Sequence, residues 1–216
     1  MNTNPKAIRV LCYGDSNTHG RDAKQKAKDG VKTRLPVGVR WTSLVQEMLG
    51  TDFEVIEEGL GGRTTDLDDP KDPSRNGLTY LHPCIASHVP IDIVVFMLGT
   101  NDLKDKFERS ADDVAQANKR LLGVITDMLP NTKIILISPI HVDGNNPMSI
   151  ENYSLATKKS HQLGEKLSKV ADEFGYAFID IAQHIQPSKY DGVHIDEKDQ
   201  RTVAELVVRK IKEICH

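Results

Sequence analysis

The stretch VLCYGDSNTHG, residues 10–20, decides the fold because a buried strand and a polar loop meet in it. Its first four residues are apolar or aromatic, which predicts a buried strand of a parallel sheet. Gly14, Asp15 and Ser16 then break the pattern and predict a tight loop at the end of that strand. In open α/β sheets ligands bind at this edge, so Ser16 is a candidate nucleophile. Taken alone, the same three residues also fit an ordinary turn.

The composition sets the class of protein to consider. The chain has 216 residues, of which 38% are hydrophobic, and its net charge is -3. Such a chain can bury a substantial core, and it has no overall basic field that would attract nucleic acid or an anionic membrane. No apolar run approaches the length of a membrane span, and the first residues lack the layout of a signal peptide. We therefore expect no nucleic-acid or membrane partner and a cytoplasmic location.

Cysteine usage agrees with a reducing compartment. Cys12, Cys84 and Cys215 are odd in number and far apart, which fits buried or free thiols better than a disulfide framework. No Cys/His cluster has the spacing of zinc ligands. We expect neither a bound metal nor a cofactor.

Apolar runs alternate with helical patterns along the chain. The runs predict five strands, at residues 7–13, 53–57, 91–98, 133–137 and 176–181. Helical spacing and capping signals predict helices between them and after the last one, at residues 41–49, 76–88, 111–128, 149–174 and about 203–211. The basic stretch over residues 21–40 has no apolar periodicity and is expected to be an exposed loop.

This alternation predicts a three-layer α/β/α fold with a parallel sheet, and no linker or repeat divides residues 1–216 into more than one domain. In the flavodoxin-like strand order 2-1-3-4-5, the ends of the first three strands are neighbours. Loops carrying Ser16, Gly62 and Asn101 then converge. The backbone amides of Ser16 and Gly62 and the side-chain amide of Asn101 can bind an oxyanion there.

A serine nucleophile needs a base, and the chain has eight histidines. His194 is favoured because Asp191 precedes it by three residues, so the carboxylate can hold one ring nitrogen while the other faces Ser16. The loop from about residue 182 is long enough to reach back across the sheet edge. His19 is the alternative base, and otherwise we expect it to line the pocket.

Four short blocks resemble, in order, the signature blocks of the SGNH hydrolases, also called GDSL-type esterases and lipases: GDSNT at 14–18, Gly62, GTND at 99–102 and DGVH at 191–194. The resemblance implies Ser16 as nucleophile, His194 as base and Asp191 as its orienting partner. It also implies Ser16, Gly62 and Asn101 as oxyanion donors and the same flavodoxin-like sheet.

Residues 53–60, 63–65 and 97–102 resemble the bacterial arylesterase and acyltransferase branch of that family. The resemblance implies hydrolysis of small acyl esters, acyl transfer to alcohols in some members, and homo-oligomers. Members noted for transfer carry bulky apolar residues after the nucleophile block, where this chain has His19 and Arg21. A more polar pocket admits water, so we expect hydrolysis to dominate. We expect His19 and Arg63 to contact the substrate.

Three other functions stay open. A carbohydrate deacetylase of the same family would use the same residues on acetylated sugars. A metal-dependent phosphoesterase is suggested by the faint similarity of residues 14–15, 19–20 and 99–102 to metal-binding loops, although an opening Asp-x-His motif and a cluster of His and Asp ligands are missing. A flavodoxin-like binding module would have the fold with an inactive pocket.

Overall fold

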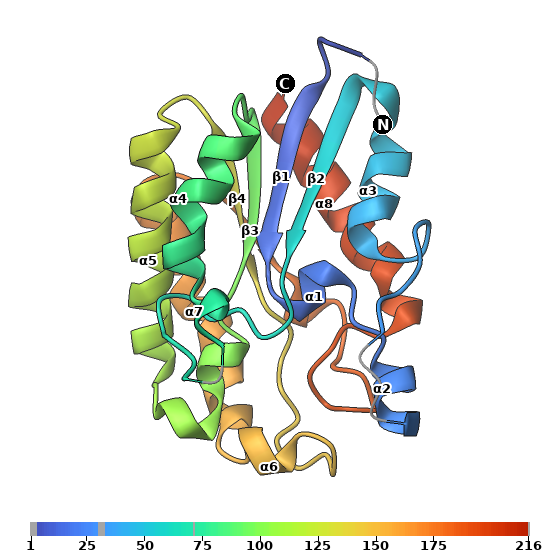
Figure 1. Ribbon diagram of the computed structural model, residues 1–216, viewed down its shortest axis with the longest axis vertical. Helices are drawn as coiled ribbons and strands as arrows, with labels where there is room; N and C mark the ends of the chain where they lie inside the picture. The colour runs from blue at the N-terminus through green and yellow to red at the C-terminus, as the bar shows by residue number, and fades with distance from the viewer. Residues whose placement is uncertain (1–3, 30–32, 71, 216) are drawn as a thin grey trace.

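Five parallel strands form the centre of the computed structural model, which describes residues 4–29, 33–70 and 72–215. They are β1 (Ile8–Gly14), β2 (Phe53–Gly59), β3 (Ile93–Met97), β4 (Lys133–Ser138) and β5 (Ala177–Asp180). Their order, β2-β1-β3-β4-β5, confirms the predicted flavodoxin-like α/β fold. The carboxyl ends of β1 and β2 point toward the short helix α1 (Ser16–His19) in Figure 1.

Helices cover both faces of this sheet (Figure 1). One face carries α4 (Gly77–His88), α5 (Ala111–Met128) and α7 (Ala156–Phe174), and the other carries α3 (Trp41–Leu49) and α8 (Gln200–Cys215). The short helices α2 (Ala23–Asp29) and α6 (Ile150–Tyr153) lie beyond the carboxyl ends of the strands. Single 3-10 turns lie at Gly50–Asp52, Pro73–Arg75, Asn101–Leu103, Asp105–Phe107, Ile181–Gln183 and Glu197–Asp199.

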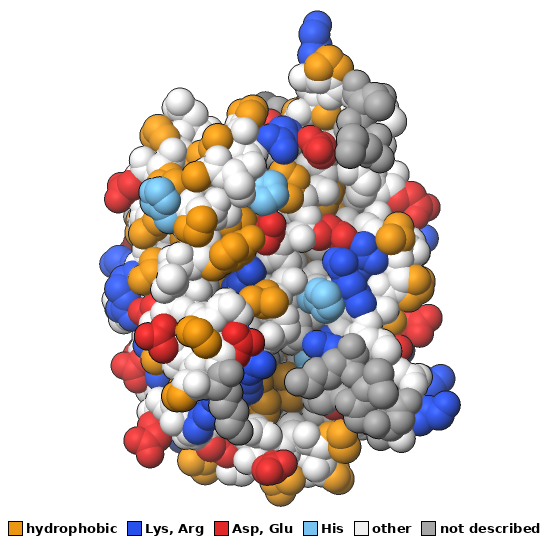
Figure 2. Space-filling view, viewed as in Figure 1, with side chains coloured by type: hydrophobic (Ala, Val, Ile, Leu, Met, Phe, Trp, Pro, Cys, Tyr) orange, Lys and Arg blue, Asp and Glu red, His pale blue; other side chains and the backbone are white. Residues whose placement is uncertain are grey.

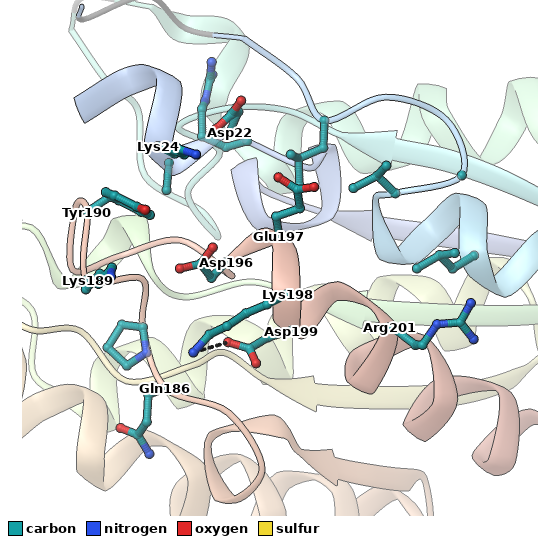
Figure 3. Close-up of a pocket in the computed structure, with 17 residues that line it drawn as sticks. Asp22, Lys24, Gln186, Lys189, Tyr190, Asp196, Glu197, Lys198, Asp199 and Arg201 are labelled. Carbon is teal, nitrogen blue, oxygen red and sulfur yellow. Dashed lines mark ion pairs between the residues drawn. The ribbon is translucent and has the colours of Figure 1, made fainter. Parts of the chain in front are cut away.

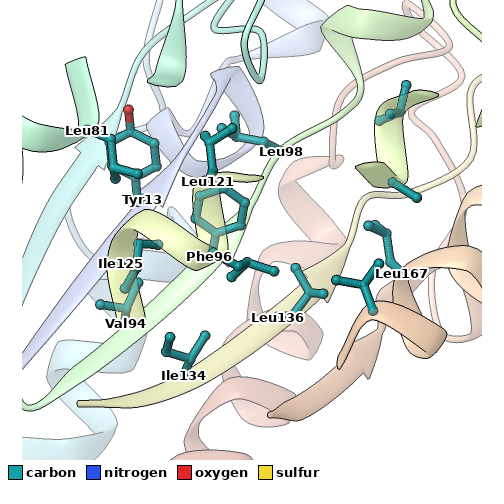
Figure 4. Close-up of a cluster of buried hydrophobic side chains, with 14 of the residues drawn as sticks. Tyr13, Leu81, Val94, Phe96, Leu98, Leu121, Ile125, Ile134, Leu136 and Leu167 are labelled. Atoms are coloured by element: carbon teal, nitrogen blue, oxygen red, sulfur yellow. The ribbon is translucent and has the colours of Figure 1, made fainter. Parts of the chain in front are cut away.

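Successive residues of each strand contribute to opposite sides of the core. On β3, Val94 and Phe96 pack toward α4, α5 and α7, while Val95 and Met97 pack toward α3 and α8. Figure 4 shows the first of these clusters, in which the Phe96 ring stacks on Tyr13 with 5.8 Å between centroids. Burial of both faces explains why β3 is a continuous apolar run in the sequence.

The single helix predicted over residues 149–174 is instead the two helices α6 and α7. Between them, the backbone N–H groups of Ser154 and Leu155 donate to the Asp105 carboxylate at 2.8 and 3.0 Å. Such side-chain acceptors compete with the helical hydrogen bonds, so the helix is interrupted. The prediction was wrong because Asp105 lies 49 residues before Ser154 in the chain.

The exposed loop predicted over residues 21–40 is also wrong in part. α2 occupies its first half, and residues 30–32 lie outside the described part. Arg40 is buried, and its guanidinium donates to both carboxylate oxygens of Glu57 on β2, at 2.7 and 2.6 Å. A buried guanidinium requires such a partner, so this segment is anchored to the sheet.

Acidic and basic side chains are mixed over the face shown in Figure 2, in agreement with the net charge of -3. Cys12, Cys84 and Cys215 are free thiols, as predicted, and the first two are buried. Among the described residues, no helix combines the length and the apolar character that crossing a membrane requires.

Candidate active site

Ser16 is the first residue of α1, just beyond the end of β1. Asp15 caps this helix, because its carboxylate accepts the Asn17 N–H at 2.8 Å. The Asp15 side chain is buried, and burial raises the pKa of its carboxyl. The cap fixes the turn that holds Ser16 at the carboxyl edge of the sheet.

Ser16, His194 and Asp191 form a chain of hydrogen bonds, although Ser16 and His194 are 178 residues apart. His194 Nε2 lies 2.9 Å from Ser16 Oγ, and His194 Nδ1 lies 2.5 Å from Asp191 Oδ2. The other carboxylate oxygen of Asp191 accepts the backbone N–H groups of Val193 and His194, both at 3.1 Å. These bonds fix the orientation of the imidazole and direct Nε2 to the serine.

Asn17 joins the loop that carries His194 to the loop that carries Ser16. Its side-chain oxygen accepts the Ile195 N–H at 2.9 Å, and its amide donates to the Val193 carbonyl at 3.4 Å. The partners of Asn17 lie 176 and 178 residues away in the chain, so no sequence spacing could have revealed this link.

Gly62 and Asn101 lie in the same cleft as Ser16 and His194. Gly62 has a φ of 86°, a conformation that other residues adopt only with strain. The Asn101 amide is held from two sides: Nδ2 donates to the Arg63 carbonyl at 3.1 Å, and Oδ1 accepts the Tyr153 hydroxyl at 3.3 Å. The structure therefore brings together the five residues predicted for the triad and the oxyanion site.

The cleft has a volume of about 250 Å³. Arg21 was expected beside the pocket from the sequence. Most of the other side chains that complete its walls were not, and these include Arg75, Lys104, Met148, Asn152 and Tyr153. They come from loops on both sides of the sheet edge, and the paths of such loops have no signature in the sequence.

His19 and Arg63, which were predicted to contact the substrate, do not line this cleft. Arg63 is buried, donates to the Gly14 carbonyl at 2.9 Å, and stacks over the Tyr13 ring at 4.3 Å from the centroid. His19 is partly buried, and its backbone carbonyl accepts a hydrogen bond from Arg34 at 2.6 Å. The prediction is corrected at both positions. Arg63 is buried beneath the cleft and binds the carbonyl of Gly14 at the end of β1, and His19 lies outside the cleft.

Asp102 braces two loops. Its carboxylate accepts the Thr65 N–H at 3.0 Å and a bond from Arg109 at 3.2 Å. Complete burial raises the pKa of Asp102 to about 6 in spite of these bonds. The acid therefore holds the loop after β3 against the loop after β2 and does not line the cleft.

Within the described residues, one group of side chains has metal-ligand types close together: Glu58, Cys84 and His88. None of the three lines the cleft. Burial, and then the nearby charge of Glu58, raise the pKa of the Cys84 thiol to about 12. The group lies away from the cleft, so it does not place a metal ion beside Ser16.

A Ser–His–Asp chain beside backbone and amide donors, at the carboxyl edge of a parallel sheet, is typical of hydrolases that transfer acyl groups. Residues 12–200 match the GDSL-like Lipase/Acylhydrolase family, and the chain belongs to that family. Its fold is the SGNH hydrolase fold.

Solved structures of two esterases are similar to this chain, covering 96% of it and 99% of their own length. A carbohydrate acetylesterase from Sinorhizobium meliloti is 31% identical with a TM-score of 0.89, and the aryl esterase of M. smegmatis is 34% identical with a TM-score of 0.85. An acetylxylan esterase from Xylanibacter ruminicola is 25% identical over 95% of this chain. The chain spans 43% of the length of that curated relative.

Proposed function

We propose that the protein hydrolyses short-chain acyl esters of small molecules through a covalent acyl-enzyme on Ser16. The distance of 2.9 Å between Ser16 Oγ and His194 Nε2, with Asp191 on the other ring nitrogen, carries this proposal. The similarity to an aryl esterase and a carbohydrate acetylesterase supports esters as the substrate class.

In the first half of the reaction, Ser16 Oγ attacks the ester carbonyl carbon while its proton passes to His194 Nε2. Asp191 stabilises the imidazolium that forms. The carbonyl oxygen becomes an oxyanion and accepts hydrogen bonds from the backbone amides of Ser16 and Gly62 and from Asn101 Nδ2. Asn101 Nδ2 also lies 3.4 Å from Asp15 Oδ2, and we expect the oxyanion to replace this contact, the longest that the amide makes.

The tetrahedral intermediate then collapses, and His194 gives its proton to the leaving alcohol while the acyl group stays on Ser16. Water attacks the acyl carbon as His194 takes one of its protons, and a second collapse releases the acid and restores the serine. An alcohol in place of that water would give acyl transfer. The charged and polar walls of the cleft keep water close to the acyl-enzyme, so hydrolysis dominates and acyl transfer is a side activity.

The test is steady-state hydrolysis of 4-nitrophenyl acetate by Ser16→Ala and by His194→Ala. Each change should lower kcat at least about a thousandfold, because Ser16→Ala removes the nucleophile and His194→Ala removes the base that activates it. His184→Ala, outside the cleft, is the matched control and should keep the wild-type rate. Wild-type turnover by Ser16→Ala, with the far-UV circular dichroism of the folded protein, would refute the proposal.

The same assay distinguishes a metal-dependent phosphoesterase from a serine esterase. The triad supplies the nucleophile, the base and the oxyanion donors from the protein itself, so we expect prolonged treatment with EDTA to leave the rate unchanged. Loss of activity with the chelator and recovery with a divalent cation would favour the metal-dependent class.

A carbohydrate deacetylase is the second candidate, and the likeness to the Sinorhizobium meliloti acetylesterase favours it. Release of acetate from acetylated xylose or glucose, compared with release from the aryl acetate by the same enzyme, distinguishes the two. A higher kcat/KM on the sugars would make the sugar esters the substrate class.

A further inference from the structure

The cleft around Ser16 carries three cations and no acid. Arg21, Arg75 and Lys104 line it, and no Asp or Glu of the described residues does. The acid Asp191 is fully buried behind its surface. Any ligand in the cleft therefore meets a wall with an excess of positive charge.

Two of these cations lie against the turn that carries Gly62. A Cβ atom added to Gly61 would lie 2.8 Å from Arg21 Nη2, and one added to Gly62 would lie 3.0 Å from Arg75 Nε. The absence of side chains at both glycines therefore lets the two guanidinium groups approach the backbone beside the nucleophile.

The three charges are not equally neutralised. Arg75 forms ion pairs with Asp69 at 3.1 Å and with Asp72 at 3.0 Å. Within the described ranges, Arg21 and Lys104 form no ion pair with a carboxylate, although the charge of Asp191 attracts Arg21; Arg21 Nη1 donates to the Thr33 carbonyl at 3.4 Å. These two cations are available to a ligand.

Lys104 is the more deeply enclosed of the two. Lys104 follows Asn101 by three residues in the chain. Its Nζ lies 5.9 Å from the centre of the Tyr153 ring. The groups that face it are the cations Lys106 and Arg75, the acids Asp69 and Asp15, and the ring of Tyr153. Burial, followed by the two neighbouring cations, lowers the pKa of Lys104 to about 8, and the two acids offset this only in part. A bound anion would relieve this repulsion.

The neighbouring cavity shows that the excess of cations is particular to the cleft. This cavity, of about 700 Å³, shares Arg21 with the cleft. Around it, Figure 3 shows acids and bases together: Asp22, Lys24, Lys189, Asp196, Glu197, Lys198, Asp199 and Arg201. Its charges largely cancel, whereas those of the cleft do not.

We propose that the preferred substrate is an ester that also carries a carboxylate, which Lys104 and Arg21 bind inside the catalytic cleft. This inference rests on the proposed esterase function. The carboxylate can belong to the acyl part or to the alcohol part of the ester, since both would occupy the same small cleft. Charge-assisted hydrogen bonds to the two cations would position the ester next to Ser16.

Two matched pairs of esters test the inference and show whether the carboxylate belongs to the alcohol part or to the acyl part of the ester. For the alcohol part, 4-acetoxybenzoate is compared with its methyl ester; for the acyl part, 4-nitrophenyl hemisuccinate is compared with 4-nitrophenyl butyrate. For each pair, the kcat/KM of the anionic ester is divided by that of the neutral ester. This ratio is then corrected for intrinsic reactivity, by dividing it by the ratio of the rates at which hydroxide hydrolyses the same two esters. We expect the corrected ratio to be about ten or more for at least one pair, mainly through a lower KM.

Lys104→Met should lower that ratio about tenfold, and Lys119→Met, which removes the same charge from the exposed face of α5, should leave it unchanged. The wild-type ratio should also fall as the pH rises past about 8, where Lys104 loses its charge. Corrected ratios well below ten for both pairs, or equal ratios in Lys104→Met and Lys119→Met, would overturn the inference. Failure of the esterase proposal looks different, because the wild type would then hydrolyse none of the four esters, or Ser16→Ala would hydrolyse them as fast as the wild type does.

Discussion

The side-chain amide of Asn101 is fixed before any substrate binds, by the Arg63 carbonyl and the Tyr153 hydroxyl. A donor that is already oriented stabilises an oxyanion without a cost of reorganisation. Asn101→Ala should therefore lower kcat on 4-nitrophenyl acetate about 10²-fold while KM changes little. Steady-state kinetics check this, and a kcat within about threefold of the wild type would exclude Asn101 from the oxyanion site.

Residue chemistry explains which site residues could be predicted. The serine at a strand end and the histidine after a well-spaced aspartate are restricted by what the reaction needs, so Ser16, Asp191 and His194 were found. Arg63 was misplaced because no pattern separates a guanidinium that binds carbonyls from one that faces a ligand. Lys104 was missed because the Tyr153 ring, which lies 5.9 Å from its Nζ, comes 49 residues further along the chain.

At the level of elements, Glu57 ties β2 to the segment before α3. It accepts bonds from Arg40 and Arg34 at distances of 2.6 to 3.0 Å. Burial alone would raise the pKa of Glu57, but the hydrogen bonds from Arg40 and Thr42 outweigh it and lower the pKa. The folded state thus favours the carboxylate, which stabilises the fold above the unfolded value of 4.5, and this contribution is lost as the pH falls through the folded pKa.

Glu57→Gln should consequently lower the free energy of unfolding by about 2 kcal/mol at neutral pH, because the buried Arg40 loses its charged partner. At a second, acidic pH below the folded pKa of Glu57, which lies under the unfolded value of 4.5, the difference from the wild type should shrink toward zero. Urea denaturation at the two pH values measures both effects. Glu54→Gln, which breaks a more exposed pair with Arg9, should cost less than about 1 kcal/mol. A pH-independent cost at Glu57 would contradict this explanation.

Strands were easier to predict than helices and loops. The β3 run is apolar because both faces of the sheet are covered, and that condition is visible in the sequence itself. The interruption between α6 and α7 depends on Asp105, and the anchoring of the segment before α3 depends on Glu57. Both partners are distant in the chain, so local periodicity contained no information about them.

On the scale of the whole molecule, two hydrophobic clusters hold the layers together. Phe96 belongs to the cluster under α4, α5 and α7, and Ile137 belongs to the cluster under α3 and α8. Both are fully buried, so Phe96→Ala and Ile137→Ala should each lower the free energy of unfolding by about 3 to 4 kcal/mol. Urea denaturation followed by circular dichroism and by Trp41 fluorescence measures this.

Leu155, with 65% of its surface exposed, is the control, and Leu155→Ala should change stability by no more than about 0.5 kcal/mol. A loss below about 1 kcal/mol for either core variant would mean that its face of the sheet contributes little to stability. The strand order was predictable at this scale because strands alternating with helices permit few topologies. The shape of the cleft was not, since long-range contacts decide it, and homo-oligomerisation stays a prediction that a mass measurement in solution can test.

We propose that His194 activates Ser16 as a nucleophile, and intact-protein mass spectrometry after treatment with a fluorophosphonate measures this activation. We expect one adduct per wild-type chain, mapped to Ser16, no adduct in Ser16→Ala, and labelling slowed at least about 10²-fold in His194→Ala. Labelling of Ser16→Ala at the wild-type rate, or of His194→Ala as fast as the wild type, would contradict it.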